Sequence, residues 1–212
     1  LGRFCNYRCS YCWPYARSDR KDHRPTELCL KTIEEIKRQA RDNGFNSFHF
    51  SLSGGEPTFH PGYLDILKYL ASDVDNTNYT SIHMTSNCSR PIKWFKQYVE
   101  YAKPFHRASI TASLHTEHLN TKDKMQDFAD KLILCQEHDV QVTINMVMVP
   151  AWFEKDWENA LFWINTMYDR IPHSRLDGWK SAVLALNDQI DDSKTYLKKF
   201  QKQRPEIKKL AD

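Results

Sequence analysis

Strand-like and helix-like patterns alternate along most of this chain, and this alternation limits its possible folds more than any other feature. Short runs of alternating or β-branched residues end near Leu52, Thr85, Leu114 and Val149. Between them lie longer stretches whose apolar residues recur every three or four positions, as in an amphipathic helix. Strands that alternate with helices favour right-handed βαβ units and a parallel sheet, with functional loops at the carboxyl ends of the strands.

We expect six strands and six helices in turn. The expected strands lie at 1–4, 48–52, 79–85, 108–114, 140–149 and 181–186, and the expected helices at 26–43, 61–70, 91–98, 125–135, 153–164 and 196–200. Six units are too few for a closed eight-stranded barrel. The expected fold class is therefore α/β, a partial (β/α)6 barrel with a curved parallel sheet and a gap that could admit a bulky substrate. We assign 1–190 to this core domain and 191–212 to a charged helix that begins an extension.

Composition excludes few functions. The chain has 212 residues, 41% of them hydrophobic, and a formal net charge of +3. It contains neither an apolar tract of about 18 residues nor a basic, apolar signal sequence, so we expect a soluble, cytoplasmic protein that does not enter a membrane. The lysines of 198–209 are typical of a solvated helix face and are a weak sign of nucleic-acid binding. Because Leu1 begins only four residues before the first cysteine, we expect further sequence beyond the ends.

Cysteine usage is more informative. Three of the six cysteines, Cys5, Cys9 and Cys12, fall within eight positions directly after the first expected strand. Such clustering suits a metal site in a reducing compartment better than a disulfide framework. Four thiolates ordinarily hold an iron–sulfur cluster, so three would leave one iron open to another ligand. The alternatives are a zinc site or buried thiols, and zinc would need a fourth ligand such as His23, at no standard spacing. A plain ferredoxin is disfavoured because no fourth cysteine stands at ferredoxin spacing.

The C-x3-C-x2-C loop, with Tyr11 before its last cysteine, resembles the C-x3-C-x-aromatic-C motif of the radical S-adenosylmethionine (SAM) superfamily. This resemblance implies a [4Fe–4S] cluster on Cys5, Cys9 and Cys12, whose open iron takes the amino nitrogen and carboxylate of the methionine part of SAM. It also implies that the reduced cluster passes an electron to the sulfonium, and that the resulting 5′-deoxyadenosyl radical abstracts hydrogen from a substrate. The electrons would come from a flavodoxin or ferredoxin-type donor.

A second motif follows the next strand. The sequence Ser53-Gly54-Gly55-Glu56 contains two glycines that would let the backbone turn sharply and approach a ligand closely. Alone, such a loop is usually only a turn. One βα unit after the cysteine loop, it resembles the family's GGE motif, which implies that backbone carbonyls and Glu56 receive the methionine amino group.

The third strand end is similar to the Thr-Asn-Gly-Ser of many members, with Ser86 and Asn87 as candidate cofactor-binding residues. Cys88 stands where glycine is common, which puts the local turn in doubt because cysteine disfavours positive φ. Cys88 is either a packed loop residue or a reactive thiol that faces the substrate. We interpret Cys29 and Cys135, on apolar helix faces, as core residues.

Two further strand ends carry candidate residues. Hydroxyls alternate along 109–113, and the resemblance implies a ribose contact that we assign to Ser113. His115 could handle protons for the substrate, with a capping or surface role as the alternative. The resemblance further implies that Val147 or Met148 packs on the adenine ring, although either could simply fill the core.

Together these residues predict a radical SAM enzyme that acts on a small molecule, such as a nucleotide or a sugar. The first alternative is a radical SAM enzyme that modifies a peptide or protein. The second is an iron–sulfur protein that binds or senses without catalysis, which would hold a cluster and leave SAM intact.

Overall fold

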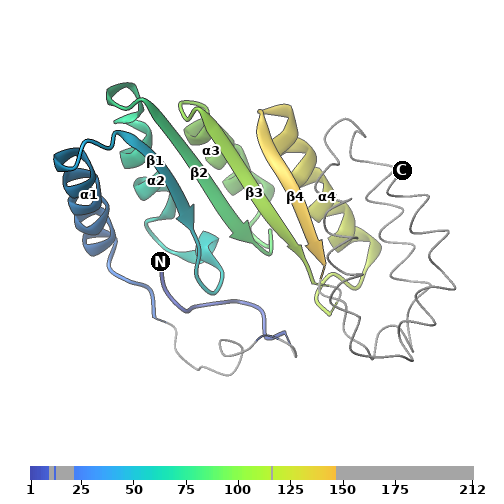
Figure 1. Ribbon diagram of the computed structural model, residues 1–212. Helices are drawn as coiled ribbons and strands as arrows, with labels where there is room; N and C mark the ends of the chain where they lie inside the picture. The colour runs from blue at the N-terminus through green and yellow to red at the C-terminus, as the bar shows by residue number, and fades with distance from the viewer. Residues whose placement is uncertain (10–11, 13–21, 116, 147–212) are drawn as a thin grey trace, which may run out of the picture.

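We analysed a computed structural model, which describes residues 1–9, 12, 22–115 and 117–146. It contains a parallel sheet in the order β1-β2-β3-β4 (Figure 1). The strands are β1 (Ser47–Leu52), β2 (Tyr79–Ser86), β3 (Arg107–Leu114) and β4 (Val140–Met146), and the α-helices are α1 (Thr26–Asp42), α2 (Tyr63–Ala71), α3 (Ile92–Ala102) and α4 (Lys122–Glu137). Two 3-10 turns, η1 (Pro57–Phe59) and η2 (Val74–Asn76), complete the elements. Within the described part of the chain, no helix is long and apolar enough to cross a membrane.

Every strand pairs with the next strand in the sequence, and all three pairings are parallel. Right-handed crossovers in one direction place successive helices on the same face of a sheet. Figure 1 shows this arrangement, with α2, α3 and α4 behind the sheet and α1 beside β1. The α/β class and the open, all-parallel sheet of a partial barrel are therefore confirmed.

The expected strand at 1–4 is wrong. Gly2 forms only an isolated antiparallel bridge with His23, and its carbonyl accepts a hydrogen bond from Gly55 in the loop after β1. The segment thus pairs with a loop and not with the body of a strand. The expected elements at 153–164, 181–186 and 196–200, the end of the 140–149 strand and the domain boundary at 190 lie outside the described residues.

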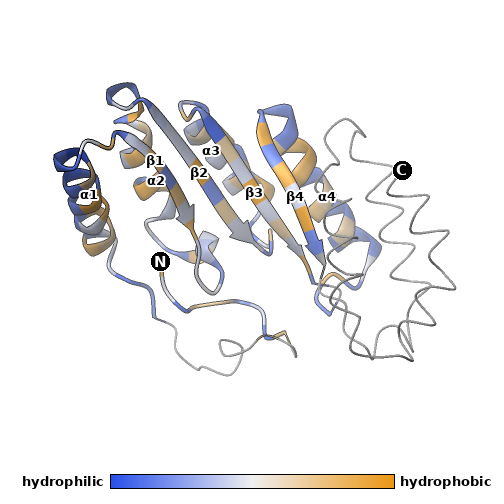
Figure 2. Ribbon diagram, viewed as in Figure 1, coloured by the Kyte–Doolittle hydropathy of each residue, from blue (hydrophilic) through white to orange (hydrophobic). Residues whose placement is uncertain are grey.

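One face of the sheet and the helices that cover it form the hydrophobic core. Ile82, Met84, Ile110 and Leu114 alternate along β2 and β3, and each is almost fully buried. Burial of a side chain of this size contributes about 1.5–3 kcal/mol to folding. Figure 2 shows the corresponding two-sided character of α1, hydrophilic on one side and hydrophobic on the other. Cys29 and Cys135 both belong to this core, as predicted.

The other face of the sheet is polar. It carries every second residue of 47–51, 79–85, 107–113 and 141–145, and each of these side chains bears a hydroxyl, amide, imidazole or guanidinium group. Hydrogen bonds between neighbouring strands join these side chains, including His49 to Ser81 at 2.8 Å and His83 to Ser109 at 2.9 Å. Alternation with period two therefore separates an apolar layer on one side from a hydrogen-bonded layer on the other.

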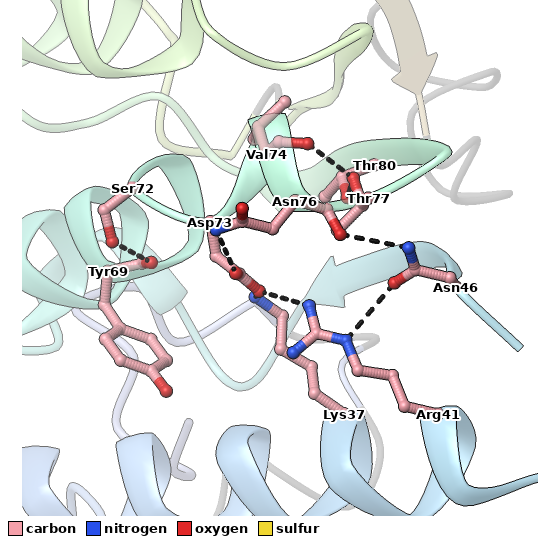
Figure 3. A network of polar contacts seen from close by, with 10 residues as sticks. All are labelled: Lys37, Arg41, Asn46, Tyr69, Ser72, Asp73, Val74, Asn76, Thr77 and Thr80. Atoms are coloured by element: carbon pink, nitrogen blue, oxygen red, sulfur yellow. Dashed lines mark hydrogen bonds and ion pairs between the residues drawn. The ribbon is translucent and has the colours of Figure 1, made fainter.

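A partly buried ion pair ties α1 to the connection between α2 and β2 (Figure 3). The Lys37 ammonium, on a side chain only 4% exposed, lies 2.7 Å from Asp73 Oδ2, and Arg41 donates to the same oxygen at 2.8 Å. Arg41 also donates to Asn46, whose amide reaches the Asn76 carbonyl at 3.0 Å. These contacts fix α1 near the amino ends of the strands, so its own amino end is held close to the loop after β1.

Candidate metal centre

The N-terminal segment, residues 1–9, passes the carboxyl ends of three strands in succession. Its backbone meets the loop after β1, where Glu56 N–H donates to the Phe4 carbonyl at 2.7 Å. Asn6 then reaches the end of β2, where its Oδ1 accepts from Asn87 Nδ2 at 3.0 Å. Finally the Tyr7 ring contacts the loop after β3. This path brings the cysteines to the edge of the sheet where parallel β/α proteins place their functional loops.

Gly54 and Gly55 are required by the close approach of this segment. A Cβ on Gly54 would lie 2.6 Å from the Gly2 carbonyl oxygen, and one on Gly55 would lie 2.3 Å from the Phe4 carbonyl oxygen. Positive φ occurs at Gly2 and Gly44 among the described glycines, and not in this pair. The backbone bends at both glycines without positive φ, and the segment that comes close to them is the chain's own. The predicted close approach to a ligand stays a prediction.

Glu56 joins the ends of β1 and β2 through its buried carboxylate, which is 2% exposed. One oxygen accepts from Thr58 N–H at 3.2 Å, from Thr58 Oγ1 at 2.7 Å and from Ser86 Oγ at 2.8 Å. The other accepts from Asn87 N–H at 2.6 Å. Burial raises the pKa of Glu56, and these donors oppose that rise because they stabilise the ionised form. A contact between this carboxylate and an amino group stays a prediction.

Cys88 completes the turn after β2 in the left-handed region, with φ 55°. The doubt about a non-glycine residue at this turn is answered by its hydrogen bonds: Cys88 N–H donates to Ser86 Oγ, and the buried Lys131 ammonium donates to the Cys88 carbonyl, each at 3.0 Å. The thiol packs in the core, and burial raises its pKa well above the ordinary value. The interpretation of Cys88 as a reactive, substrate-facing thiol is therefore wrong.

The three clustered thiols lie near one another. Cys9 is buried, Cys5 and Cys12 are half-buried, and Cys12 N–H donates to the Cys9 carbonyl at 3.1 Å. Burial raises the pKa of Cys5 to about 11, with further increments from the charges of Glu56, Cys9 and Cys12. The Tyr7 N–H donates to Cys5 Sγ at 3.4 Å, a contact that favours the thiolate. Three thiols whose charges interact, with a backbone donor aimed at one sulfur, fit a bound iron–sulfur group.

His23, the proposed fourth ligand of a zinc site, packs against Phe4 and His60 with ring centroids 5.0 and 5.5 Å apart. The structure instead brings Glu117 and His118 to Cys9, with one ligand atom from each of the three within 4.8 Å of the others. Sequence reasoning missed this proximity, because no ligand spacing links Cys9 to residues more than a hundred positions away.

The loop after β3 contacts the N-terminal segment through aromatic rings. His118 stacks on Tyr7 with ring centroids 3.9 Å apart, and His115 meets the same ring edge-on at 5.8 Å. Burial lowers the pKa of His115 to about 4, with a smaller contribution from nearby His118, so His115 is neutral near pH 7. His115 thus lies beside the cysteine segment, and its predicted part in proton handling stays a prediction.

Of the remaining predicted site residues, Ser113 and Ser53 lie in the described part of the structure and the others do not. Ser113 lies half-buried near the end of β3, opposite Asn145 of β4, and Ser53 accepts a hydrogen bond from the Leu1 ammonium through its carbonyl oxygen at 3.0 Å. Tyr11, Val147 and Met148 lie outside the described residues.

The sheet is open and parallel, and three clustered cysteines lie at its carboxyl edge. These features define a class of protein that can hold a metal cluster over a sheet face. Comparison with known protein families matches residues 1–164 to the Radical SAM superfamily, and the chain belongs to that family. The family implies a [4Fe–4S] cluster and SAM as co-substrate. No curated protein matches the chain.

Proposed function

We propose that the chain is a radical SAM enzyme that binds a [4Fe–4S] cluster through Cys5, Cys9 and Cys12 and cleaves SAM reductively. The observation that carries this proposal is the path of the N-terminal segment, which hydrogen-bonds to the Gly54–Gly55 loop and so places the thiols beside it. When bound, the reduced cluster supplies the electron that cleaves SAM and produces a 5′-deoxyadenosyl radical. An external flavodoxin or ferredoxin-type protein is the expected electron donor.

The chain's own residues position the cofactor. The Gly54–Gly55 loop donates backbone hydrogen bonds to the N-terminal segment, from Gly55 N–H to the Gly2 carbonyl and from Glu56 N–H to the Phe4 carbonyl. We assign the backbone carbonyls of this loop to the amino group of SAM. Glu56 keeps this loop and the end of β2 in register, since its carboxylate bridges both. Ser113, at the end of β3, offers a hydroxyl for the ribose. His115, neutral beside Tyr7, is suited to accept a proton near the same edge.

Anaerobic reconstitution with iron and sulfide, followed by dithionite and SAM, tests this function. We expect iron and sulfide to be incorporated and 5′-deoxyadenosine to form. Cys9→Ala should lose both, because Cys9 is the buried member of the cysteine turn.

Cys29→Ala is the matched control, because this cysteine is also buried but lies in the core on α1. It should retain both the cluster and the activity. A fully loaded wild-type protein that forms no more 5′-deoxyadenosine than Cys9→Ala would contradict an enzymatic role and favour a non-catalytic iron–sulfur protein.

A further inference from the structure

The polar face of the sheet holds a preorganised hydrogen-bond network centred on His83. This residue lies on β2, between Ser51 of β1 and Ser109 of β3 in the strand register. His83 Nδ1 is 2.9 Å from Ser109 Oγ, and Ser109 Oγ donates to the Ile82 carbonyl at 3.3 Å. The other ring nitrogen of His83, Nε2, lies 3.3 Å from Thr111 Oγ1.

These contacts favour one tautomer of His83. When the single hydroxyl proton of Ser109 goes to the Ile82 carbonyl, Ser109 accepts a hydrogen bond from His83 Nδ1. In this tautomer Nδ1 carries the proton, and Nε2 is a hydrogen-bond acceptor near the Thr111 and Thr85 hydroxyls. Burial, together with the charges of His49 and Arg107, lowers the pKa of His83 and keeps the ring neutral. The polar face of the sheet thus presents a neutral imidazole that can accept a hydrogen bond.

The network is continuous with the proposed cofactor site. Thr85 and Thr111 follow His83 and Ser109 on the same face in the direction of the carboxyl edge, and Ser113 follows Thr111. At a rise of about 3.3 Å per residue, the four residue steps from His83 to Asn87, which directly follows β2, span about 13 Å. A small molecule that reached from His83 to the cofactor site would contact hydroxyl groups along its length.

The chemistry of this face is selective. In the described ranges 47–51, 79–85, 107–113 and 141–145, the side chains of the polar face include no carboxylate, and the cation is Arg107. An ammonium group would find no acidic partner on this surface. An apolar chain would cover polar groups without replacing their hydrogen bonds to water, which costs about 1–3 kcal/mol for each buried group. A hydroxylated molecule satisfies the same donors and acceptors.

We propose that the polar face is the substrate-binding surface and that it takes a small polyhydroxylated molecule, neutral or anionic, with His83 Nε2 accepting a hydrogen bond from a substrate hydroxyl. This inference rests on the proposed function, which supplies the reacting cofactor at the carboxyl edge. It goes beyond that function because it assigns a substrate class and a substrate-contacting residue.

Saturation-transfer NMR on the cluster-loaded protein tests the proposal, with excess S-adenosylhomocysteine added to occupy the cofactor site. The hydroxylated probes are glucose, glucose 6-phosphate, gluconate and inositol, and the comparison probes are lysine and octanoate. We expect transfer to carbon-bound protons of at least one hydroxylated probe and none to lysine or octanoate.

Two variants complete the test. His83→Asn keeps a side-chain donor for Ser109 but has no atom at the position of Nε2, so it should weaken binding of the transferring probe by about fivefold, as expected for one lost hydrogen bond of roughly 1 kcal/mol. His138→Asn, at the end of α4, should bind like the wild type. The proposal is overturned if no hydroxylated probe shows transfer, if lysine or octanoate shows more, or if His83→Asn binds equally well. Failure of SAM cleavage with sugar binding intact would instead contradict the proposed function alone.

Discussion

His118 stacks face to face on Tyr7, with ring centroids 3.9 Å apart and an angle of 10° between the planes. Tyr7 lies between Cys5 and Cys9 in the sequence, so this stack packs the loop after β3 against the cysteine segment. A short cysteine loop has little hydrophobic core of its own to hold it. The stack therefore provides a tertiary contact that orders the ligands before any cluster binds.

Loss of the stack should loosen the cluster. An aromatic pair of this kind contributes about 0.5–1.5 kcal/mol beyond its buried area. His118→Ala should therefore lose iron to a chelator several times faster than the wild type, whereas His118→Phe, which keeps a flat ring on Tyr7, should lose it at nearly the wild-type rate. Absorbance of the cluster over time in the presence of the chelator measures both. Equal rates for the alanine variant and the wild type would show that the stack does not order the cysteine turn.

Gly55→Ala should prevent cluster assembly while the sheet still folds. The added Cβ would lie 2.3 Å from the Phe4 carbonyl oxygen, so the N-terminal segment must move away from the loop after β1. Iron content after reconstitution should fall to near zero, and the far-ultraviolet circular dichroism should change little.

Gly44→Ala provides the control for this experiment. A Cβ on Gly44 meets nothing within 4 Å, but the residue has φ +82°. Its replacement should cost about 1 kcal/mol of stability through backbone strain and leave iron content unchanged. A Gly55→Ala protein that assembles a full cluster would show that the close approach is dispensable.

Local patterns were sufficient to predict the described helices, the strands β1–β4 and the three clustered thiols. Each of these depends on spacing within about twenty residues, and the apolar alternation that defines β3, for example, is visible in the sequence itself. The strand expected at 1–4 was wrong because its prediction also depended on a local pattern. Residues 1–4 are too few to show a period, and their partner is a loop.

Interactions across the fold were not predictable from spacing. Glu56 depends on Ser86 and Asn87, about thirty positions later, for the donors that surround its carboxylate. The positive φ of Cys88 depends on Lys131, which lies on a helix 43 positions away. For Lys131 the sequence signal is only a charged residue beside an apolar stretch, which indicates a buried partner without naming it.

Asp73 should make stability depend on pH in the acid range. Burial raises its pKa, but hydrogen bonds from Lys37, Asn76 and Arg41 outweigh burial and bring the pKa to about 2. A carboxyl group whose pKa is lower in the folded protein than its unfolded value of about 3.9 stabilises the fold above that value. This contribution should be lost as the pH falls from about 4 toward 2.

Urea unfolding of the wild type and of Asp73→Asn at several pH values measures this contribution. At pH 7 the variant should be less stable by on the order of 3 kcal/mol, because the buried Lys37 ammonium keeps no carboxylate partner. The difference between the two proteins should shrink as the pH falls below 4. A difference that stays constant between pH 7 and pH 3 would mean that Asp73 titrates normally.

Glu56→Gln should separate the structural part of this residue from its predicted contact with the cofactor. The amide nitrogen of glutamine is a donor, so in either orientation it would face a donor now bonded to the carboxylate, either Asn87 N–H or the Thr58 and Ser86 groups. Burial of such a mismatch costs about 1–3 kcal/mol. We therefore expect a lower melting temperature together with weaker SAM binding by the cluster-loaded protein.

Ser86→Ala removes one of the donors to Glu56 and leaves the carboxylate in place, which makes it the matched comparison. If Glu56 only holds the loops in register, SAM affinity in the two variants should fall in proportion to their loss of stability. If the carboxylate also receives the amino group, Glu56→Gln should bind SAM far more weakly than a Ser86→Ala protein of similar stability. Isothermal titration with SAM under oxidised, anaerobic conditions distinguishes the two, because binding is then measured without turnover.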